Sequence, residues 1–297
     1  MDVIALARQA KHRLWVLRKR WRRARRRVPL HLATAFGPLW SRLHPYRFDP
    51  NRYLGERTKR WPHDFLAEEV TSRGDQEGAL PRRVFVVWTG TNELTPNRAR
   101  NLRALRDVIG VPVEFITPKN LRDWVVDDHP LHPAYKNLSL VHQSDYLRAY
   151  LLHHYGGGYC DLKRPLASWA PVFEAMRSRP DVWLTSFSER NAFDPARLSG
   201  RLGFDVSMNY TRLVGCSAMI CRSGTAFTRE WLSEVERRLD VLEPELALHP
   251  GGIRNEAAGY PVSWTDLLGK VYHPLQLKHL DRVQADDRLL LEFHDYQ

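Results

Sequence analysis

The residues best suited to chemistry in this chain stand in one short stretch. Asp145 and Arg148 are three positions apart, so on a helix they share a face and could reach a common polar ligand. Gly156-Gly157-Gly158 follows them, and Asp161 and Lys163 come just beyond the glycines. Taken alone, the first pair would be an ordinary ion pair worth a few tenths of a kcal/mol, and the glycines could be only a helix stop. The residue types therefore leave a ligand site and an ordinary helix end both open.

Strands and helices alternate around this stretch. Short apolar runs predict strands at residues 84–88, 111–117, 159–162, 182–187 and 217–221. Capping and turn signals predict helices at residues 95–108, 118–126, 140–155, 168–179 and 225–239. This alternation predicts an α/β fold with a mainly parallel sheet flanked by helices. Ligands of such sheets sit beyond the carboxyl ends of the strands, where the pattern places Trp88-Thr89-Gly90 and Asp161-Leu162-Lys163.

Composition predicts one large folded domain behind a basic segment. The chain has 297 residues, 43% of them hydrophobic, which is enough to bury a core. Nearly all of the net charge of +11 lies in residues 1–30, where eleven Lys and Arg residues face the single acid Asp2. We predict three parts: a basic amphipathic N-terminal segment (1–45), a polar connecting region (46–80) and a large domain (81–297) that contains the chemical stretch. The odd number of cysteines and their spacing favour small buried thiols in a reducing cytosol.

The N-terminal segment has the pattern of a basic amphipathic helix. Its apolar residues follow steps of four and three: Val3, Ala7, Ala10, Leu14, Leu17 and Trp21. Such a helix suits an anionic membrane surface, where each basic residue adds on the order of 1 kcal/mol. A helix docked on its own domain is the equal alternative. A nucleic-acid interface is disfavoured, because the apolar stripe would have no role there. No run is long and apolar enough to span a bilayer, and the charged start is not a secretory signal. The reduced cysteines favour a cytoplasmic protein, and the membrane alternative for the basic helix would make it peripheral on the inner face of the membrane.

As a whole, the chemical stretch resembles the signature of the DXD-containing sugar-transferase family. That family includes fungal outer-chain mannosyltransferases and bacterial capsular polysaccharide synthesis proteins, and the catalytic domains of the large clostridial glucosylating toxins are similar. Its pattern is S-D-x-x-R-x-x-x-L followed by Y-G-G-x-Y-x-D-x-D. The residues in register are Ser144, Asp145, Arg148, Leu152, Tyr155, Gly156, Gly157, Tyr159 and Asp161. Val87-Trp88-Thr89-Gly90 upstream, and Tyr260 to Trp264 and Tyr272 to Leu275 downstream, also look similar, so the resemblance covers roughly residues 82–275.

The resemblance implies a GT-A-type nucleotide-diphospho-sugar transferase fold and assigns roles to its matching residues. Trp88 would stack on the nucleotide base, and Asp145 and Arg148 would hold the ribose or donor sugar and the diphosphate. Asp161 would bind a divalent metal, Mn²⁺ or Mg²⁺, on the diphosphate. The remaining residues expected to line the nucleotide-sugar site are Thr89, Gly90, Ser144 and Tyr159.

Lys163 departs from the family pattern, because it stands where the family has a second acid. A protonated lysine is no metal ligand, and three interpretations follow. In the first, Lys163 neutralises the diphosphate and makes the metal dispensable. In the second, the metal stays on Asp161 with a later residue such as His273, whose place resembles a histidine ligand of related folds. In the third, the chain binds the nucleotide sugar without catalysing its transfer.

We expect an active hexosyltransferase with a UDP- or GDP-sugar donor. It would transfer the sugar, with retention, to a hydroxyl of a polysaccharide or lipid-linked glycan in capsular or cell-surface polysaccharide synthesis. A catalytically silent nucleotide-sugar-binding protein is the closer alternative, and a nucleic-acid-binding protein the more distant one.

Overall fold

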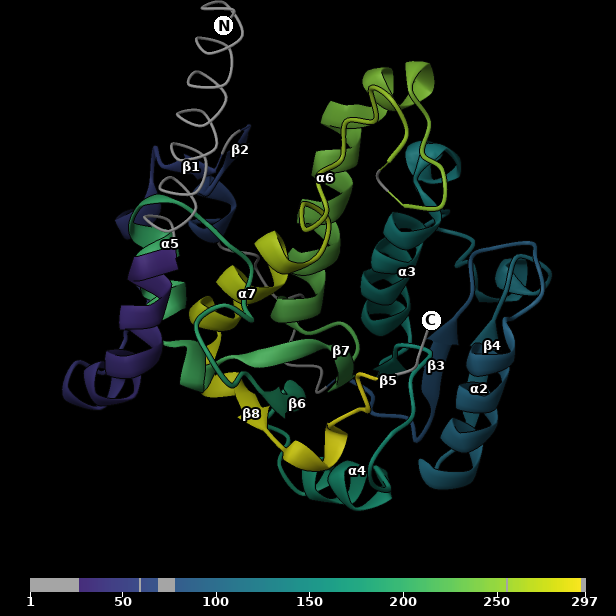
Figure 1. Cartoon of the computed structure of the whole chain (residues 1–297), viewed down its shortest axis with the longest axis horizontal. Helices are drawn as coiled ribbons and strands as arrows, with labels where there is room; N and C mark the ends of the chain where they lie inside the picture. The colour runs from purple at the N-terminus through teal and green to yellow at the C-terminus, as the bar shows by residue number, and fades with distance from the viewer. Residues whose placement is uncertain (1–26, 59, 69–77, 255, 295–297) are drawn as a thin grey trace, which may run out of the picture.

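The computed structural model describes residues 27–58, 60–68, 78–254 and 256–294. The predicted basic helix over residues 1–27 therefore lies almost entirely outside the described residues. The rest forms a sheet with helices packed on its two faces, which confirms the predicted α/β fold (Figure 1). None of the described helices is both long and apolar enough to cross a membrane.

The main sheet of the described residues has six strands in the order β4-β3-β5-β7-β6-β8. Their bounds are β3 Val84–Val87, β4 Val113–Ile116, β5 Gly157–Cys160, β6 Leu184–Ser188, β7 Val214–Cys221 and β8 Val283–Ala285. The β3 strand pairs in parallel with β4 and β5, and β6 pairs in parallel with β8. β7 is antiparallel to both of its neighbours, β5 and β6. The sheet is thus mostly parallel as predicted, but neither the reversal of β7 nor the last strand was predicted.

Apolar side chains are buried on both faces of this sheet. Phe85 and Val87 point into a core shared with α3 Leu140–His154, α6 Ala226–Leu248 and α7 Gly269–Lys278. Val84 and Val86 point the other way, into a core shared with α2 Pro96–Val108 and α4 Ala170–Arg177. Burial on both faces explains why the strand reads as a continuous apolar run without alternation. The prediction of a strand there and of helices on both faces is confirmed.

A smaller group of elements packs beside the sheet near the N-terminus. It contains a helix over residues 27–43, the 3-10 helices η1 Pro50–Tyr53 and η2 Asp64–Leu66, the hairpin β1 Arg57–Thr58 with β2 Trp61–Pro62, and α5 Gly200–Met208. Four side chains of the region expected to be a connection join the main core: Tyr53, Trp61, Phe65 and Leu66. The guanidinium of Arg52 is 2.6 Å from the Asp205 carboxylate of α5. Residues 46–68 therefore contribute to the packed fold instead of only linking two parts.

Local sequence signals set the ends of the helices that flank the chemical stretch. Thr95 and Ser139 cap α2 and α3, where each hydroxyl accepts from a backbone amide of the first turn. Ser168 was expected to cap α4, but the cap residue is Trp169, and the Ser168 hydroxyl accepts from Ala170 N at 3.3 Å. The end of α3 is followed by Gly156 and Gly157 with φ of 65° and 94°. These glycines lie at the amino end of β5, so they turn the chain into the sheet.

Replacing Gly157 with alanine tests how closely the chain packs at this turn. A Cβ there would approach Arg83 O to 2.9 Å at a φ of +94°, whereas the same addition at Gly224, with φ of +63°, meets nothing within 4 Å. We expect Gly224→Ala to lower the free energy of unfolding by about 1 kcal/mol from backbone strain alone. Gly157→Ala should lower it by about 2–4 kcal/mol, since crowding adds to the strain. Urea unfolding of both variants measures the difference, and equal losses would contradict the close approach.

Candidate functional site

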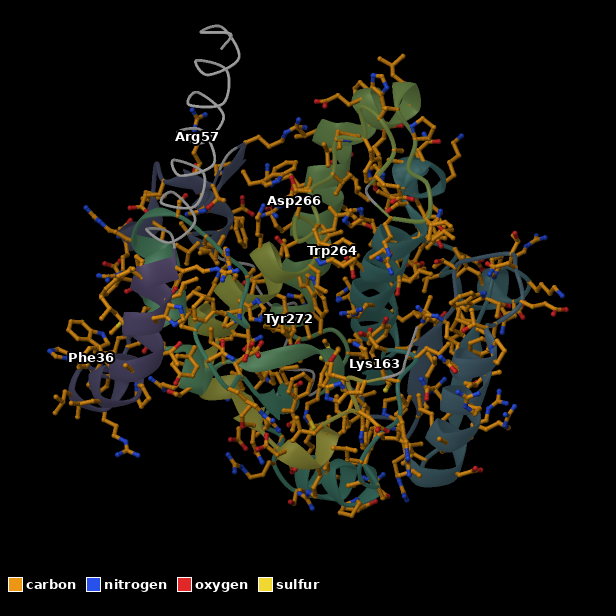
Figure 2. The ribbon with its side chains drawn as sticks, in the orientation of Figure 1. Phe36, Arg57, Lys163, Trp264, Asp266 and Tyr272 are labelled. Atoms are coloured by element: carbon orange, nitrogen blue, oxygen red, sulfur yellow. The ribbon has the colours of Figure 1, made fainter. Side chains whose placement is uncertain are left out.

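The chemical residues meet at the carboxyl ends of β3 and β5, below the face of α3. Asp145 and Arg148 lie one helical turn apart on α3 and are only 5% and 4% exposed. Asp161 and Lys163 follow directly after β5, with Lys163 labelled beside that strand in Figure 2. Because β7 is reversed, its first residues reach the same edge of the sheet. Sequence reasoning placed this edge correctly.

The guanidinium of Arg148 holds three elements together. Its Nη2 donates to the hydroxyl of Tyr159 and to Oδ1 of Asp161, both at 3.0 Å, and its Nη1 donates to the backbone carbonyl of Cys216 on β7. Its distance to Asp145, the partner expected from spacing, is longer, at 3.6 Å. Arg148 is therefore bound across the sheet instead of forming a simple ion pair along its helix.

Asp161 sits between two cations. Lys163 Nζ donates to its Oδ2 at 2.9 Å, while its Oδ1 accepts from Arg148. Burial alone would raise the pKa of Asp161, but Lys163 and Arg148 outweigh it and hold the pKa below the ordinary value. Asp161 is therefore ionised at neutral pH. The three groups together carry a net charge of +1, which favours an anionic ligand.

Asp145 has a different environment from Asp161. Burial raises the pKa of Asp145 to about 7, an increase that the nearby Arg148 opposes and the negative charge of Asp161 assists. A carboxyl group with such a pKa changes its protonation near neutral pH, so it can accept or donate hydrogen bonds to a ligand hydroxyl. Perturbed carboxyl groups of this kind are typical of functional sites.

The loop after β3 forms the neighbouring wall. The Trp88 indole is partly buried, its Nε1 donates to Asn92 O at 2.9 Å, and the Arg98 guanidinium lies 5.1 Å from the centre of its ring. The Thr89 hydroxyl donates to Leu140 O at 2.7 Å, which ties this loop to the first turn of α3. Gly90 is buried at a turn where a Cβ would approach the Asn92 side chain to 2.4 Å. The structure thus brings all three loop residues to the edge of the site.

The side chains of Tyr159 and Ser144 lie next to the charged groups and contact them through the Tyr159 hydroxyl. Tyr159 is 1% exposed, and its hydroxyl contacts Ser144 at 3.0 Å, Arg148 at 3.0 Å and Asp161 at 3.3 Å. A buried hydroxyl with three polar partners orients those partners. The hydroxyl of Tyr159 thus helps to fix Arg148 and Asp161, and its expected contact with the ligand stays a prediction.

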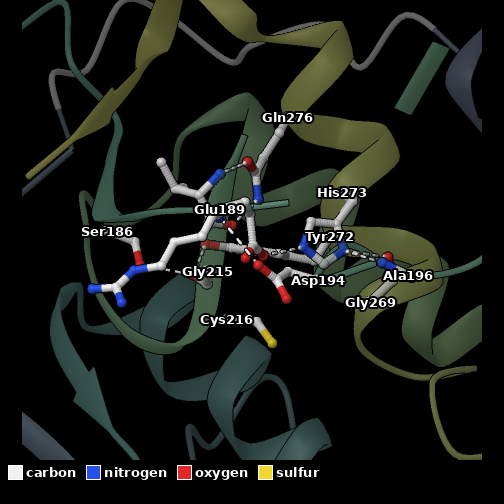
Figure 3. A network of polar contacts seen from close by, with 12 residues as sticks. Ser186, Glu189, Asp194, Ala196, Gly215, Cys216, Gly269, Tyr272, His273 and Gln276 are labelled. Carbon is white, nitrogen blue, oxygen red and sulfur yellow. Dashed lines mark hydrogen bonds and ion pairs between the residues drawn. The ribbon is translucent and has the colours of Figure 1, made fainter. Parts of the chain in front are cut away.

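A second polar group, which sequence reasoning did not single out, lies where β6 ends and β7 begins (Figure 3). Glu189 follows β6 directly, and its carboxylate is 3.2 Å from His273 Nε2 on α7. His273 Nδ1 lies 3.2 Å from the amide of Ala196 and 3.0 Å from the carbonyl of Gly269, so this nitrogen faces both a donor and an acceptor. The sequence indicates Glu189 as a candidate only through its position just after a predicted strand.

The start of β7 joins this second group to the first. Tyr272 of α7 donates to Gly215 O at 2.9 Å, and the next carbonyl, that of Cys216, accepts from Arg148. Burial raises the pKa of the Cys216 thiol to about 12, so it is neutral and unsuited to act as a nucleophile. The two polar groups are thus connected through main-chain oxygens of β7. The side-chain types along a strand do not predict which of its carbonyls accept such hydrogen bonds.

The donor set around Asp161 does not fit a resident divalent metal. Mg²⁺ and Mn²⁺ take several oxygen ligands, and both oxygens of Asp161 already bind cations of the chain. In the part of the chain that the structure describes, no group of three or more His, Cys, Asp or Glu side chains is placed to hold a metal ion. His273, the second ligand considered from sequence, binds Glu189. We therefore derive no step through a metal.

Comparison with known proteins finds a match in the same region of the chain. The family model described as "Glycosyltransferase sugar-binding region containing DXD motif" matches residues 77–167, a span that contains β3, α3, β5 and Lys163. The mostly parallel α/β sheet is consistent with a GT-A-like glycosyltransferase fold. No curated protein and no solved structure matches the chain significantly. The chain thus contains a stretch similar to a glycosyltransferase sugar-binding region, and this similarity supports a glycosyltransferase-type function.

The pKa of Asp145 makes a prediction about stability and pH. The folded pKa of about 7 lies above the ordinary 3.8, so burial of the neutral acid is fully favourable below about pH 4 and this contribution is lost as pH rises through 7. Asp145→Asn stays neutral throughout. Its stability relative to the wild type should therefore increase between pH 4 and 8, by up to about 4 kcal/mol. Urea unfolding across that range measures it, and parallel curves for the two proteins would show that the pKa is not raised.

Proposed function

We propose that this chain is a glycosyltransferase whose donor is a nucleotide-diphospho-sugar and whose diphosphate site is the cluster Arg148–Asp161–Lys163. The observation that supports this most is the pair of cations held around one partly buried carboxylate at the carboxyl edge of the sheet. The cluster falls within the span that matches the glycosyltransferase sugar-binding model. Lys163 takes the place of the second acid of the D-x-D pattern.

Two buried polar atoms beside this cluster support a ligand there. Arg148 Nε and the hydroxyl of Ser217 are buried and have no hydrogen-bond partner within the described residues. Ser217 lies next to Asp161, because its carbonyl accepts from Asp161 N at 2.8 Å. A buried donor without a partner costs about 1–3 kcal/mol, so a ligand atom that supplied the partner would bind favourably. We propose that phosphate or sugar oxygens of the donor supply the missing partners.

The chemistry follows from where negative charge develops. As the bond between sugar and diphosphate breaks, the leaving nucleotide gains charge, and fixed cations nearby stabilise it. Arg148 offers a planar fork that Tyr159 and Cys216 O hold in place, and Lys163 offers a compact charge at the end of β5. Asp145 is positioned one turn away for hydroxyl groups of the ribose or sugar. We propose transfer with retention. The acceptor oxygen bonds to the anomeric carbon as the bond to the diphosphate breaks, and the acceptor's proton passes to the departing phosphate oxygen, so no dedicated base is required.

The acceptor and location extend the proposal further. We propose a hydroxyl of a growing polysaccharide or a lipid-linked glycan, in capsular or cell-surface polysaccharide synthesis, and an enzyme that works in the cytoplasm at the inner face of the membrane. The downstream stretches around Trp264 and His273, which resemble the capsular branch, support the pathway. The basic residues at the N-terminus support the location.

Calorimetric titration with UDP- and GDP-sugars tests the donor site. Arg148→Lys keeps the charge but loses the fork that contacts Tyr159, Asp161 and Cys216, so we expect affinity to fall at least about 10-fold. Arg164→Lys is the matched control, because Arg164 is exposed and only 3.7 Å from Glu292 on the surface. Equal affinities for wild type and Arg148→Lys would refute the site. Saturable binding without any sugar transfer would leave the chain as a silent nucleotide-sugar-binding protein.

Turnover with manganese or with EDTA tests the role of Lys163. If the lysine supplies charge that a metal would otherwise provide, Lys163→Ala should lower kcat about 100-fold and the wild-type rate should resist EDTA. Arg164→Ala, the adjacent cation, should leave both unchanged. A wild-type rate that vanishes in EDTA, together with an unaffected Lys163→Ala enzyme, would assign the role to a metal.

A further inference from the structure

The helix over residues 27–43 carries its large apolar side chains on the outside. Five of them are spaced by four, four, three and four and are more than half exposed: Val28 (53%), Leu32 (52%), Phe36 (59%), Leu39 (57%) and Leu43 (66%). Figure 2 shows Phe36 at the outer edge of the molecule, away from the sheet. A surface helix of a globular protein normally turns such a stripe toward the core. Here the orientation is reversed.

Small residues on the opposite side of the helix fix this orientation. Ala33 is buried against Ala192 and Tyr210. The Thr34 hydroxyl accepts from Ala192 N at 3.0 Å, and its carbonyl accepts from the Tyr210 hydroxyl at 3.2 Å. A Cβ on Gly37 would lie 3.0 Å from Met208 O, so the helix is packed closely there. Turning the stripe inward would break these contacts and place bulky side chains where only small ones fit.

Aromatic side chains broaden the apolar surface. Trp40 is 37% exposed on the same helix, and Phe204 of α5 is 49% exposed, with their rings 5.8 Å apart and nearly perpendicular. We call this set of exposed residues the outer stripe: Val28, Leu32, Phe36, Leu39, Trp40, Leu43 and Phe204. A contiguous exposed apolar patch of this kind on a folded protein indicates a binding surface for a partner molecule or a membrane.

The charges around the outer stripe indicate what kind of partner it binds. Arg27, Arg42 and Arg47 are exposed on or beside the helix. The sequence has no acidic residue from position 3 to position 48, while residues 1–26 add ten further Lys and Arg. The apolar spacing of residues 3–21 also leads into the outer stripe, since Val28 stands seven positions after Trp21. Apolar side chains with basic residues and no acids suit the interface of an anionic bilayer.

We propose that the outer stripe docks on the surface of an anionic lipid bilayer. A second copy of the chain fits less well, because a two-fold contact would bring the same basic residues of both copies together. Nucleic acid would engage the arginines but leave the apolar side chains exposed to water. This proposal rests on the helix and its charges alone, so it stands or falls separately from the sugar-transfer site.

Flotation of the full chain with lipid vesicles tests the proposal. The wild type should float with vesicles of phosphatidylglycerol and phosphatidylcholine, and much less with phosphatidylcholine alone. Phe36→Ser with Leu39→Ser should weaken binding to the anionic vesicles at least about 10-fold, because two anchoring side chains are lost. Leu166→Ser with Leu248→Ser removes two apolar residues elsewhere that are at least as exposed, at 60% and 77%, and this variant should bind as the wild type does.

A site-specific probe separates docking of the helix from attraction by the basic residues alone. A dye sensitive to polarity at Leu39→Cys should shift to the blue with anionic vesicles, and the same dye at Leu166→Cys should not. Unchanged flotation of the Phe36–Leu39 double variant, or no shift at position 39, would overturn the proposal. So would a wild type that dimerises without lipid and becomes monomeric in the double variant. Donor affinity measured by calorimetry should be the same in the double variant as in the wild type.

Discussion

The structure depends on how one buried guanidinium is satisfied. Arg148 is 4% exposed, and a charge so deeply buried is tolerated only where hydrogen bonds and opposite charge surround it. Its partners come from α3, β5 and β7, so these three elements must meet at a single point. The reversed direction of β7 serves this need, because its antiparallel register with β5 brings the Cys216 carbonyl to the carboxyl edge of the sheet. The same register places Ser217 O on the amide of Asp161.

The arrangement of charge around Arg148 sets the two aspartates apart. Asp161 has a cation on each oxygen and stays ionised, whereas Asp145, farther from Arg148 and almost fully buried, has its pKa raised to about 7. Two carboxyl groups within one small site thus differ in protonation at neutral pH because their surroundings differ. One completes a positively charged cluster, and the other offers a group that can hold a hydroxyl in either direction.

Much of the scaffold could be predicted from sequence, because it depends on local signals. The Pro96 start of α2, the Ser139 cap of α3 and the apolar run of β3 all specify their elements through neighbouring residues. The direction of β7 could not be predicted, since a strand buried on both faces has the same composition whichever way it runs. Similarly, α7 contains Pro274, and a proline inside a segment argues against predicting a helix there. The burial of His273 on the same helix depends on tertiary contacts that the sequence does not show. Glu189 lies at the right edge of the sheet, but only the folded chain shows its partner.

The use of main-chain oxygens by the site has a consequence for its evolution. Arg148 is held by the carbonyl of Cys216, and Tyr272 is held by that of Gly215. A carbonyl is present whatever side chain stands there, so Cys216 can be replaced while its anchor persists, whereas Gly215 cannot, because a Cβ there would lie 2.0 Å from the Phe187 ring. By contrast, Asp161 and Lys163 act through their side chains, and the family similarity ends shortly after them, at residue 167. Relatives can therefore share the carbonyl that holds Arg148 in three dimensions while a different residue stands at position 216.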